Sequence, residues 1–117
     1  MYKNSNIICD ARNGFEDEKD NNTLVLNVFY TIVEGKREAF YKKVNEARIP
    51  QQSRLEEGNL KYEYYFPVES ENQILLIEIW KDEASFNAHK EMEPFKKLQI
   101  IKEEYVMDVK FEKYTDK

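Results

Sequence analysis

The sequence of 117 residues contains few of the residues that make turns, cross-links or metal sites: three glycines, three prolines, one cysteine and one histidine. Cys9 cannot form a disulfide within the chain, so nothing requires an oxidising compartment, and we expect a cytoplasmic protein. One cysteine and one histidine (His89), far apart in the chain, do not predict a zinc site, and we expect no metal. Three glycines also provide no G-x-G-x-x-G or phosphate-binding loop.

Long apolar runs and basic clusters are missing as well. No stretch of about eighteen consecutive apolar residues occurs, so we expect no membrane partner. Eighteen basic and twenty-three acidic residues give a net charge of −5, and no stripe of Lys and Arg overrides it. This balance disfavours a nucleic-acid partner.

Residues 1–22 form a polar leader rich in Asn, Asp, Glu and Lys. The leader has neither the basic start nor the apolar segment of a signal peptide. Such a composition cannot offset the entropy of its own ordering, so we expect this leader to be disordered. Residues 23–117 are then long enough for one ordered domain.

Apolar periodicity predicts four strands and two helical regions in that domain. The first helical region begins near Lys36, is kinked at Pro50 and ends before Gly58. The second begins after Asp82, whose side chain can cap it, and is interrupted at Pro94. The predicted strands are Leu24–Val33, Leu60–Phe66, Ile74–Trp80 and a final strand from Tyr105 to Glu112.

The order strand, helix, strand, strand, helix, strand predicts an α+β fold, a ferredoxin-like βαββαβ sandwich with an antiparallel sheet and helices on one face. The first strand is apolar on both sides, so its Val25, Phe29 and Val33 need a cover on the face without helices. We therefore expect a homodimer. Asn27 is the polar member of this row, and we expect it to bond across the dimer interface.

Two segments, Ser53–Tyr65 and Leu75–Leu98, resemble the antibiotic biosynthesis monooxygenase (ABM) family of dimeric α+β barrels. The resemblance spans residues 24–114 and rests on an Arg-x-Glu-x-Gly run, a Glu-x-Trp strand end and a helical Ala and His. The residues that carry it are Arg54, Glu56, Gly58, Tyr62, Glu78, Trp80, Ala84 and His89.

The resemblance implies a monooxygenase without a cofactor, in which a quinol-like or polycyclic phenolic substrate supplies the electrons and reacts as its anion with molecular oxygen. Such a protein needs a base that titrates near neutral pH, and His89 is the candidate. It also needs apolar walls with a few polar tips around the small aromatic substrate. The candidate wall residues are Tyr30, Tyr62, Trp80, Phe86 and Phe95.

Other branches of the family fit less well. Its haem degraders carry a tryptophan where this chain has His89 and an axial histidine where it has Gln99. Its sugar isomerase resembles the chain but has a second histidine where this chain has Pro94. A small-molecule isomerase of this type remains one alternative, and a non-catalytic dimeric barrel that binds a small aromatic ligand is another.

The candidate residues also have structural interpretations. His89 can be a helix residue bonded to a carbonyl group, or a polar anchor for a bound ligand. Glu78 lies inside an apolar strand, where a carboxyl group must be paired or protonated. Arg54, or a lysine on a neighbouring strand, is the expected partner of Glu78, as a structural tie that supports the site.

Overall fold

The structure, a computed structural model, describes residues 22–115, so the predicted leader lies outside the described residues except for its last position. Within the described part of the chain, no helix is long and apolar enough to cross a membrane. The elements in chain order are β1 (Leu24–Ile32), α1 (Arg37–Glu46), α2 (Ile49–Arg54), β2 (Asn59–Tyr65), β3 (Gln73–Trp80), α3 (Glu83–His89), α4 (Glu93–Tyr105) and β4 (Val106–Thr115).

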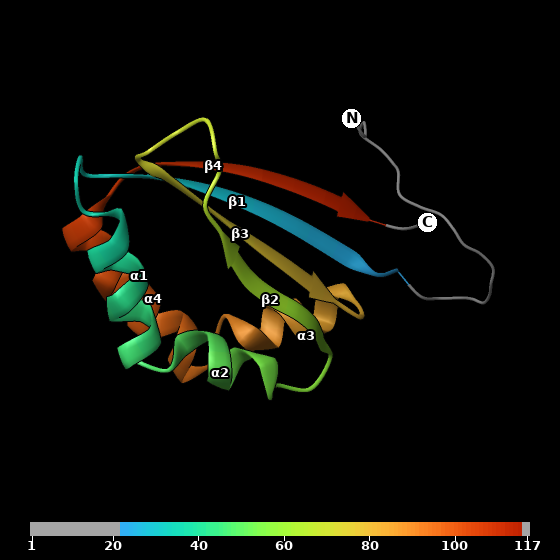
Figure 1. Ribbon diagram of the computed structural model, residues 1–117. Coiled ribbons are helices and arrows are strands. Elements are labelled where there is room, and N and C mark those ends of the chain that lie inside the picture. The colour runs from blue at the N-terminus through green and yellow to red at the C-terminus, as the bar shows by residue number, and fades with distance from the viewer. Residues whose placement is uncertain (1–21, 116–117) are drawn as a thin grey trace.

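The four strands form one sheet in the order β2-β3-β1-β4, and every neighbouring pair is antiparallel. All four helices of residues 22–115 lie on one face of this twisted sheet, and none of these residues forms a helix on the other face (Figure 1). This arrangement confirms the predicted ferredoxin-like α+β fold. Helices on one side only also mean that a site between helices and sheet can draw side chains from both layers.

Strand β1 lies in the middle of the sheet and alternates strictly between buried and half-buried residues. Its buried set, which includes Leu26 and Tyr30, faces the helices. The half-buried set, which includes Val25, Asn27 and Phe29, faces away from them. Since successive side chains of a strand point to opposite faces, this is the pattern expected of a central strand with two apolar sides.

The core fills the space between this sheet face and the helices. Phe40 and Val44 from α1, Ile49 from α2 and Leu98 from α4 pack against it. The strand residues of the core are Leu24, Leu26, Val28, Tyr30, Ile32, Tyr62, Ile74, Leu76 and Trp80.

Both predicted helical regions are divided in two. The predicted interruption at Pro94 is confirmed, whereas the prediction of a single helix kinked at Pro50 was wrong. Pro50 lies in the first turn of α2, and Pro94 lies in the first turn of α4. Proline is tolerated there because the first amide groups of a helix have no partner within it. The break before α2 occurs at Arg48, whose φ of 61° is left-handed and cannot continue a helix.

The last strand begins one residue later than predicted, because Tyr105 ends α4 and Val106 begins β4. Among residues 22–115, β4 pairs only with β1, so it is an edge strand of the described sheet. Its apolar residues remain largely accessible, with Met107 70%, Val109 42% and Phe111 51% exposed. The beginning of β4 is therefore an accessible apolar surface beside α4.

Candidate functional site

Helix α3 directs His89 toward the sheet. Asp82 precedes the helix and its Oδ1 accepts a hydrogen bond from the Ser85 backbone N–H at 2.8 Å, as the sequence predicts for an N-cap. His89 lies at the end of this short helix and is only 2% exposed. The imidazole therefore points into the protein, between α3 and the sheet.

A carboxyl group from the loop before β2 holds the imidazole. Nδ1 of His89 lies 2.7 Å from Oε1 of Glu56. Burial lowers the pKa of His89, and the hydrogen bond and charge of Glu56 oppose this shift in part. We assign the neutral tautomer in which Nδ1–H donates to Glu56, so that Nε2 is free to accept a proton.

Gly58 lets the loop approach α3 closely. Its φ is +87°, and a Cβ built there would lie 2.1 Å from Oγ of Ser85. Its carbonyl oxygen accepts a hydrogen bond from the Lys81 amide at 2.8 Å. A side chain at this position would thus separate the loop that carries Glu56 from the helix that carries His89.

Four of the five predicted wall residues surround the imidazole. The ring centroid of His89 lies 4.8 Å from that of Trp80, 5.5 Å from Phe95, 5.9 Å from Tyr62 and 6.3 Å from Phe86. Tyr30 is not in this group and packs instead against Phe40, 5.9 Å away between centroids. The rings close around His89, whose side chain is 1% exposed.

Glu78 lies on the other side of the imidazole, on the helix-facing side of β3. Its Oε1 accepts a hydrogen bond from Nε1 of Trp80 at 3.0 Å and lies 4.0 Å from Nε2 of His89. Burial raises the pKa of Glu78 to about 7; the Trp80 bond opposes the shift and the carboxyl group of Glu56 adds to it. Glu56, His89 and Glu78 therefore form a buried row of proton-carrying groups.

Three tyrosines lie near this row. Burial raises the pKa of Tyr30, Tyr62 and Tyr64 above the usual value, and the charge of Glu78 raises each of them further. The buried hydroxyl groups of Tyr62 and Tyr64 interact with each other, but neither has a hydrogen bond of good geometry within residues 22–115. Since buried polar groups are normally paired, these hydroxyls can bond to an oxygen atom of a ligand.

Two of the predicted supporting residues have other partners. Nε of Arg54 donates to the backbone oxygen of Tyr62 at 2.9 Å, so the expected pairing of Arg54 with Glu78 is wrong. The cation whose charge reaches Glu78 is Lys102, on α4 rather than on a strand. Asn27 lies on the sheet face without helices, where it donates to Oε1 of Glu112 at 3.4 Å within the same chain.

Two residues of the site were not among the predicted site residues. Glu56 belongs to the Arg-x-Glu-x-Gly run, and the run together with the helical histidine was a usable signal for the pair. Lys102 carried no signal, because it is one of several lysines in a charged helix. Among residues 22–115, no group of three His, Cys, Asp or Glu side chains is placed to hold a metal ion.

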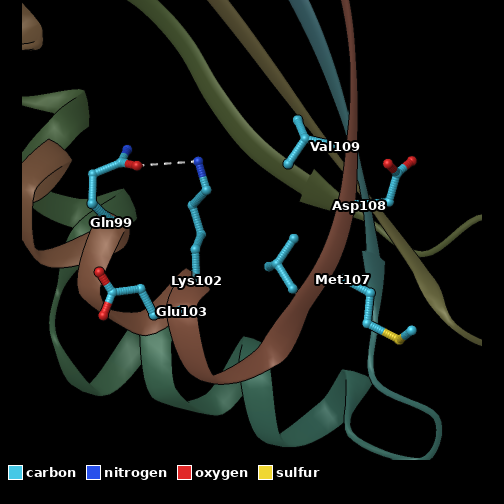
Figure 2. Close-up of a pocket in the computed structure, with 7 residues that line it drawn as sticks. Gln99, Lys102, Glu103, Met107, Asp108 and Val109 are labelled. Carbon is cyan, nitrogen blue, oxygen red and sulfur yellow. Dashed lines mark hydrogen bonds between the residues drawn. The ribbon is translucent and has the colours of Figure 1, made fainter.

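A pocket of about 440 Å³ opens between the end of α4 and the beginning of β4 (Figure 2). None of the predicted site residues lines it. Lys102 does line it, and while burial lowers the pKa of Lys102, the charge of Glu78 opposes that shift. The lining residues are Gln99, Lys102, Glu103, Val106, Met107, Asp108 and Val109.

The fold and the buried carboxyl–imidazole row define the class: a small α+β protein with a polar site between one helical layer and an antiparallel sheet. The family follows from the sequence, since residues 23–99 match the model for "Antibiotic biosynthesis monooxygenase". The chain belongs to the ABM family, as its motifs predict.

Relatives support this assignment. A Bacillus subtilis (strain 168) protein named "Putative monooxygenase YcnE" is 36% identical over 72 residues, which cover 62% of this chain and 74% of that protein.

Solved structures of similar proteins share the fold. A protein from Pseudomonas aeruginosa matches with a TM-score of 0.71 and 25% identity, covering 79% of this chain and 91% of its own. A Bacteroides thetaiotaomicron protein described as "Possible Oxidoreductase" matches with a TM-score of 0.73 and 25% identity, covering 83% of this chain and 100% of its own. A "Putative antibiotic biosynthesis monooxygenase" from Nitrosomonas europaea matches with a TM-score of 0.74 and 21% identity, covering 83% of this chain and 92% of its own.

Proposed function

We propose that the protein is a cofactor-independent monooxygenase that oxidises a quinol-like or polycyclic phenolic molecule with molecular oxygen. One observation carries the proposal: the buried row in which Glu78, with a pKa of about 7, lies 4.0 Å from Nε2 of His89, whose Nδ1 is bound to Glu56. A group that gains and loses a proton near neutral pH is what general base catalysis needs. The family and the relative named as a monooxygenase point to the same chemistry.

In the proposed reaction, Glu78 accepts the phenolic proton of the substrate. The proton can pass to Nε2 of His89, and the imidazolium that results is stabilised by Glu56. His89 acts through Glu78 in this scheme, because the side chain of His89 is only 1% exposed and that of Glu78 is 8% exposed. The neighbouring hydroxyls of Tyr62 and Tyr64 would donate to the oxygen of the substrate anion.

The electrons come from the substrate. In an anthrone-type substrate, oxidation of the ring CH₂ group to a carbonyl group releases four electrons, which reduce one O₂ molecule; one oxygen atom enters the product, and the other leaves as water with the two hydrogens of the CH₂ group. In a hydroquinone, the four electrons come from hydroxylation of one ring C–H and oxidation of the ring to the quinone, and the second oxygen atom again leaves as water. In this scheme the protein supplies the proton acceptor, and the tyrosine hydroxyls stabilise the negative charge of the substrate anion.

A homodimer is part of the proposal. The sheet face without helices carries a row of half-buried apolar residues that includes Val25, Phe29 and Ile77. A second sheet packed on this face would remove that surface from water. Sedimentation of the full chain should give twice the monomer mass of 14.1 kDa, and a monomer at micromolar concentration would contradict this part. We also propose a cytoplasmic location.

Oxygen uptake with a panel of anthrones and hydroquinones tests the reaction. We expect uptake by the wild type, a loss of about 100-fold in kcat for Glu78→Gln, and a smaller loss for His89→Ala. The wild-type rate should rise with pH through about 7, as Glu78 loses its proton. No uptake with any member of the panel, or equal uptake by all three proteins, would refute the proposal.

One observation favours a second function, a non-catalytic barrel that binds a small aromatic ligand. The side chain of His89 is 1% exposed and its Nδ1 is already bound to Glu56, as in a histidine that only stabilises a core. Saturable binding of panel members without oxygen uptake would identify this second function.

A further inference from the structure

The pocket between α4 and β4 has a cationic side and an apolar side. Figure 2 shows Gln99 and Lys102 reaching from α4 into the space, and Val109 reaching into it from β4. Met107 and Asp108 point away from it. The pocket of about 440 Å³ is large enough for a ligand of one or two aromatic rings.

Among residues 22–115, Lys102 forms no ion pair, although the charge of Glu78 reaches it from beyond 4.0 Å. Its half-buried Nζ lies 3.3 Å from Oε1 of Gln99 and 5.5 Å from the ring centroid of Tyr30. No carboxylate of residues 22–115 lies within 4.0 Å of it. Charged groups taken out of water are normally paired, so an ammonium without a carboxylate is suited to an anion from outside the chain.

The acids at the pocket limit the charge of that anion. Glu103 and Asp108 also line the pocket, but both are exposed. Asp108 is paired with Thr31 in the sheet, on the face without helices. Two hydrated carboxylates at the rim would repel a polyanion, whereas a single negative charge close to Lys102 gains a charge-assisted hydrogen bond.

The walls favour an aromatic group. Val106 and Val109 of β4 line the pocket, and Val109 is the cross-strand neighbour of Tyr30. Lys102 therefore lies between a wall of branched apolar side chains and the buried tyrosine. A flat ring placed on this wall can direct a charged oxygen toward Nζ.

We propose that the α4–β4 pocket binds an aromatic molecule with one anionic oxygen group, a phenolate or a carboxylate, and that Lys102 determines this specificity. Glu78, Tyr62 and Tyr64 do not line this pocket, so the anion site goes beyond the proposed reaction, and it rests on the proposed function only for the claim that the bound anion is also the substrate. The charge of Lys102 also lowers the pKa of Glu78, so an anion bound beside Lys102 should change the pKa of Glu78.

Calorimetric titration without turnover tests the site. The probes are 2-naphthoate, its neutral analogue 2-naphthamide, and 4-nitrophenol at a pH where it is a phenolate. We expect Lys102→Met to bind 2-naphthoate about tenfold more weakly than the wild type and Lys102→Arg to bind it within about threefold, while the amide binds equally to all three. If nitrophenolate binds and naphthoate does not, the ligand is a phenolate; the reverse indicates a carboxylate.

Two further variants locate the site. Lys96→Met removes an exposed lysine from the same helix and should leave every affinity unchanged. Val109→Trp should fill the pocket and abolish binding of both the acid and the amide. The proposal is refuted if neither anion binds at millimolar concentration, or if Lys102→Met binds them as the wild type does. Binding of the probes together with no oxygen uptake on the anthrone and hydroquinone panel would instead refute the oxygenase function and leave the site intact.

Discussion

The His89 cluster and the Lys102 pocket lie on the same side of the sheet but differ in how their charge is balanced. His89 is enclosed by four rings, and its Nδ1 is bound to the Glu56 carboxyl group of the same chain. Lys102 is half-buried beside an open pocket and has no carboxylate partner among residues 22–115. A polar group whose partner lies in the chain can be closed off, whereas one without such a partner must stay accessible to water or to a ligand.

Glu78 connects the two regions. Its Oε1 lies 4.0 Å from Nε2 of His89, and its pKa is lowered by the charge of Lys102. A perturbation of the enclosed cluster should therefore change stability, while one of the pocket should change ligand binding. The following four variants address the enclosed side of this comparison.

The largest effect is expected for Gly58→Ala, which separates the loop of Glu56 from α3. The new Cβ would overlap Ser85, at 2.1 Å from its Oγ, and the φ of +87° is unfavourable for alanine. We expect a loss of about 4 kcal/mol in the free energy of unfolding, measured with urea.

Gly35→Ala is the matched control. Gly35 has a similar φ of +78° but no atom within 4 Å of an added Cβ. It should cost only the backbone strain, about 1 kcal/mol. Equal losses for the two variants would show that close packing at Gly58 does not matter.

Glu56→Ala removes the partner of the buried imidazole and should cost about 3 kcal/mol, because Nδ1–H is left without an acceptor. The pKa of His89, followed by NMR, should fall further, since Glu56 is the group that raises it. Glu57→Ala, at the exposed neighbouring position, should change neither quantity. An unchanged imidazole titration in Glu56→Ala would mean that the pair does not form in solution.

The sequence predicts the enclosed region better than the pocket. Strand periodicity and the Asp82 cap place Trp80 and His89 correctly, because both depend on local pattern. The Glu56–His89 contact joins residues 33 positions apart and was indicated only by a family motif. The role of Lys102 could not be predicted, because it depends on which carboxylates lie near it, and no local pattern encodes that distance.

The pH dependence of the stability of Glu78→Gln tests whether ionisation of Glu78 destabilises the folded protein. The pKa of Glu78 rises from 4.5 to about 7 on folding, so the folded state holds the proton more tightly, and stability falls as pH rises between these values. The Glu78→Gln variant avoids this loss and should be more stable than the wild type by about 3 kcal/mol above pH 7, with no difference below pH 4.5. The lowered pKa of His89 destabilises both proteins at acid pH and largely cancels in the difference.

Urea titrations at several pH values give this difference directly. Glu63→Gln, an exposed carboxyl group on β2, is the control and should show no such trend. A constant difference between Glu78→Gln and the wild type at every pH would indicate that Glu78 has an ordinary pKa and cannot be the proposed base.

The smallest effect is expected for Asp82→Ala, which removes the cap of α3 and loosens only the enclosed side. The loss should be about 1 kcal/mol at pH 7, because the Ser85 amide loses its acceptor. Hydrogen bonds from Ser85 lower the pKa of Asp82, so its contribution is present above the ordinary pKa of 3.8 and disappears as pH falls through the lowered value. Asp82→Asn keeps an acceptor and should lose less stability.

Hydrogen exchange in Asp82→Ala should become faster in α3 but not at the α4–β4 pocket. Faster exchange in both would show that the two regions open as one unit.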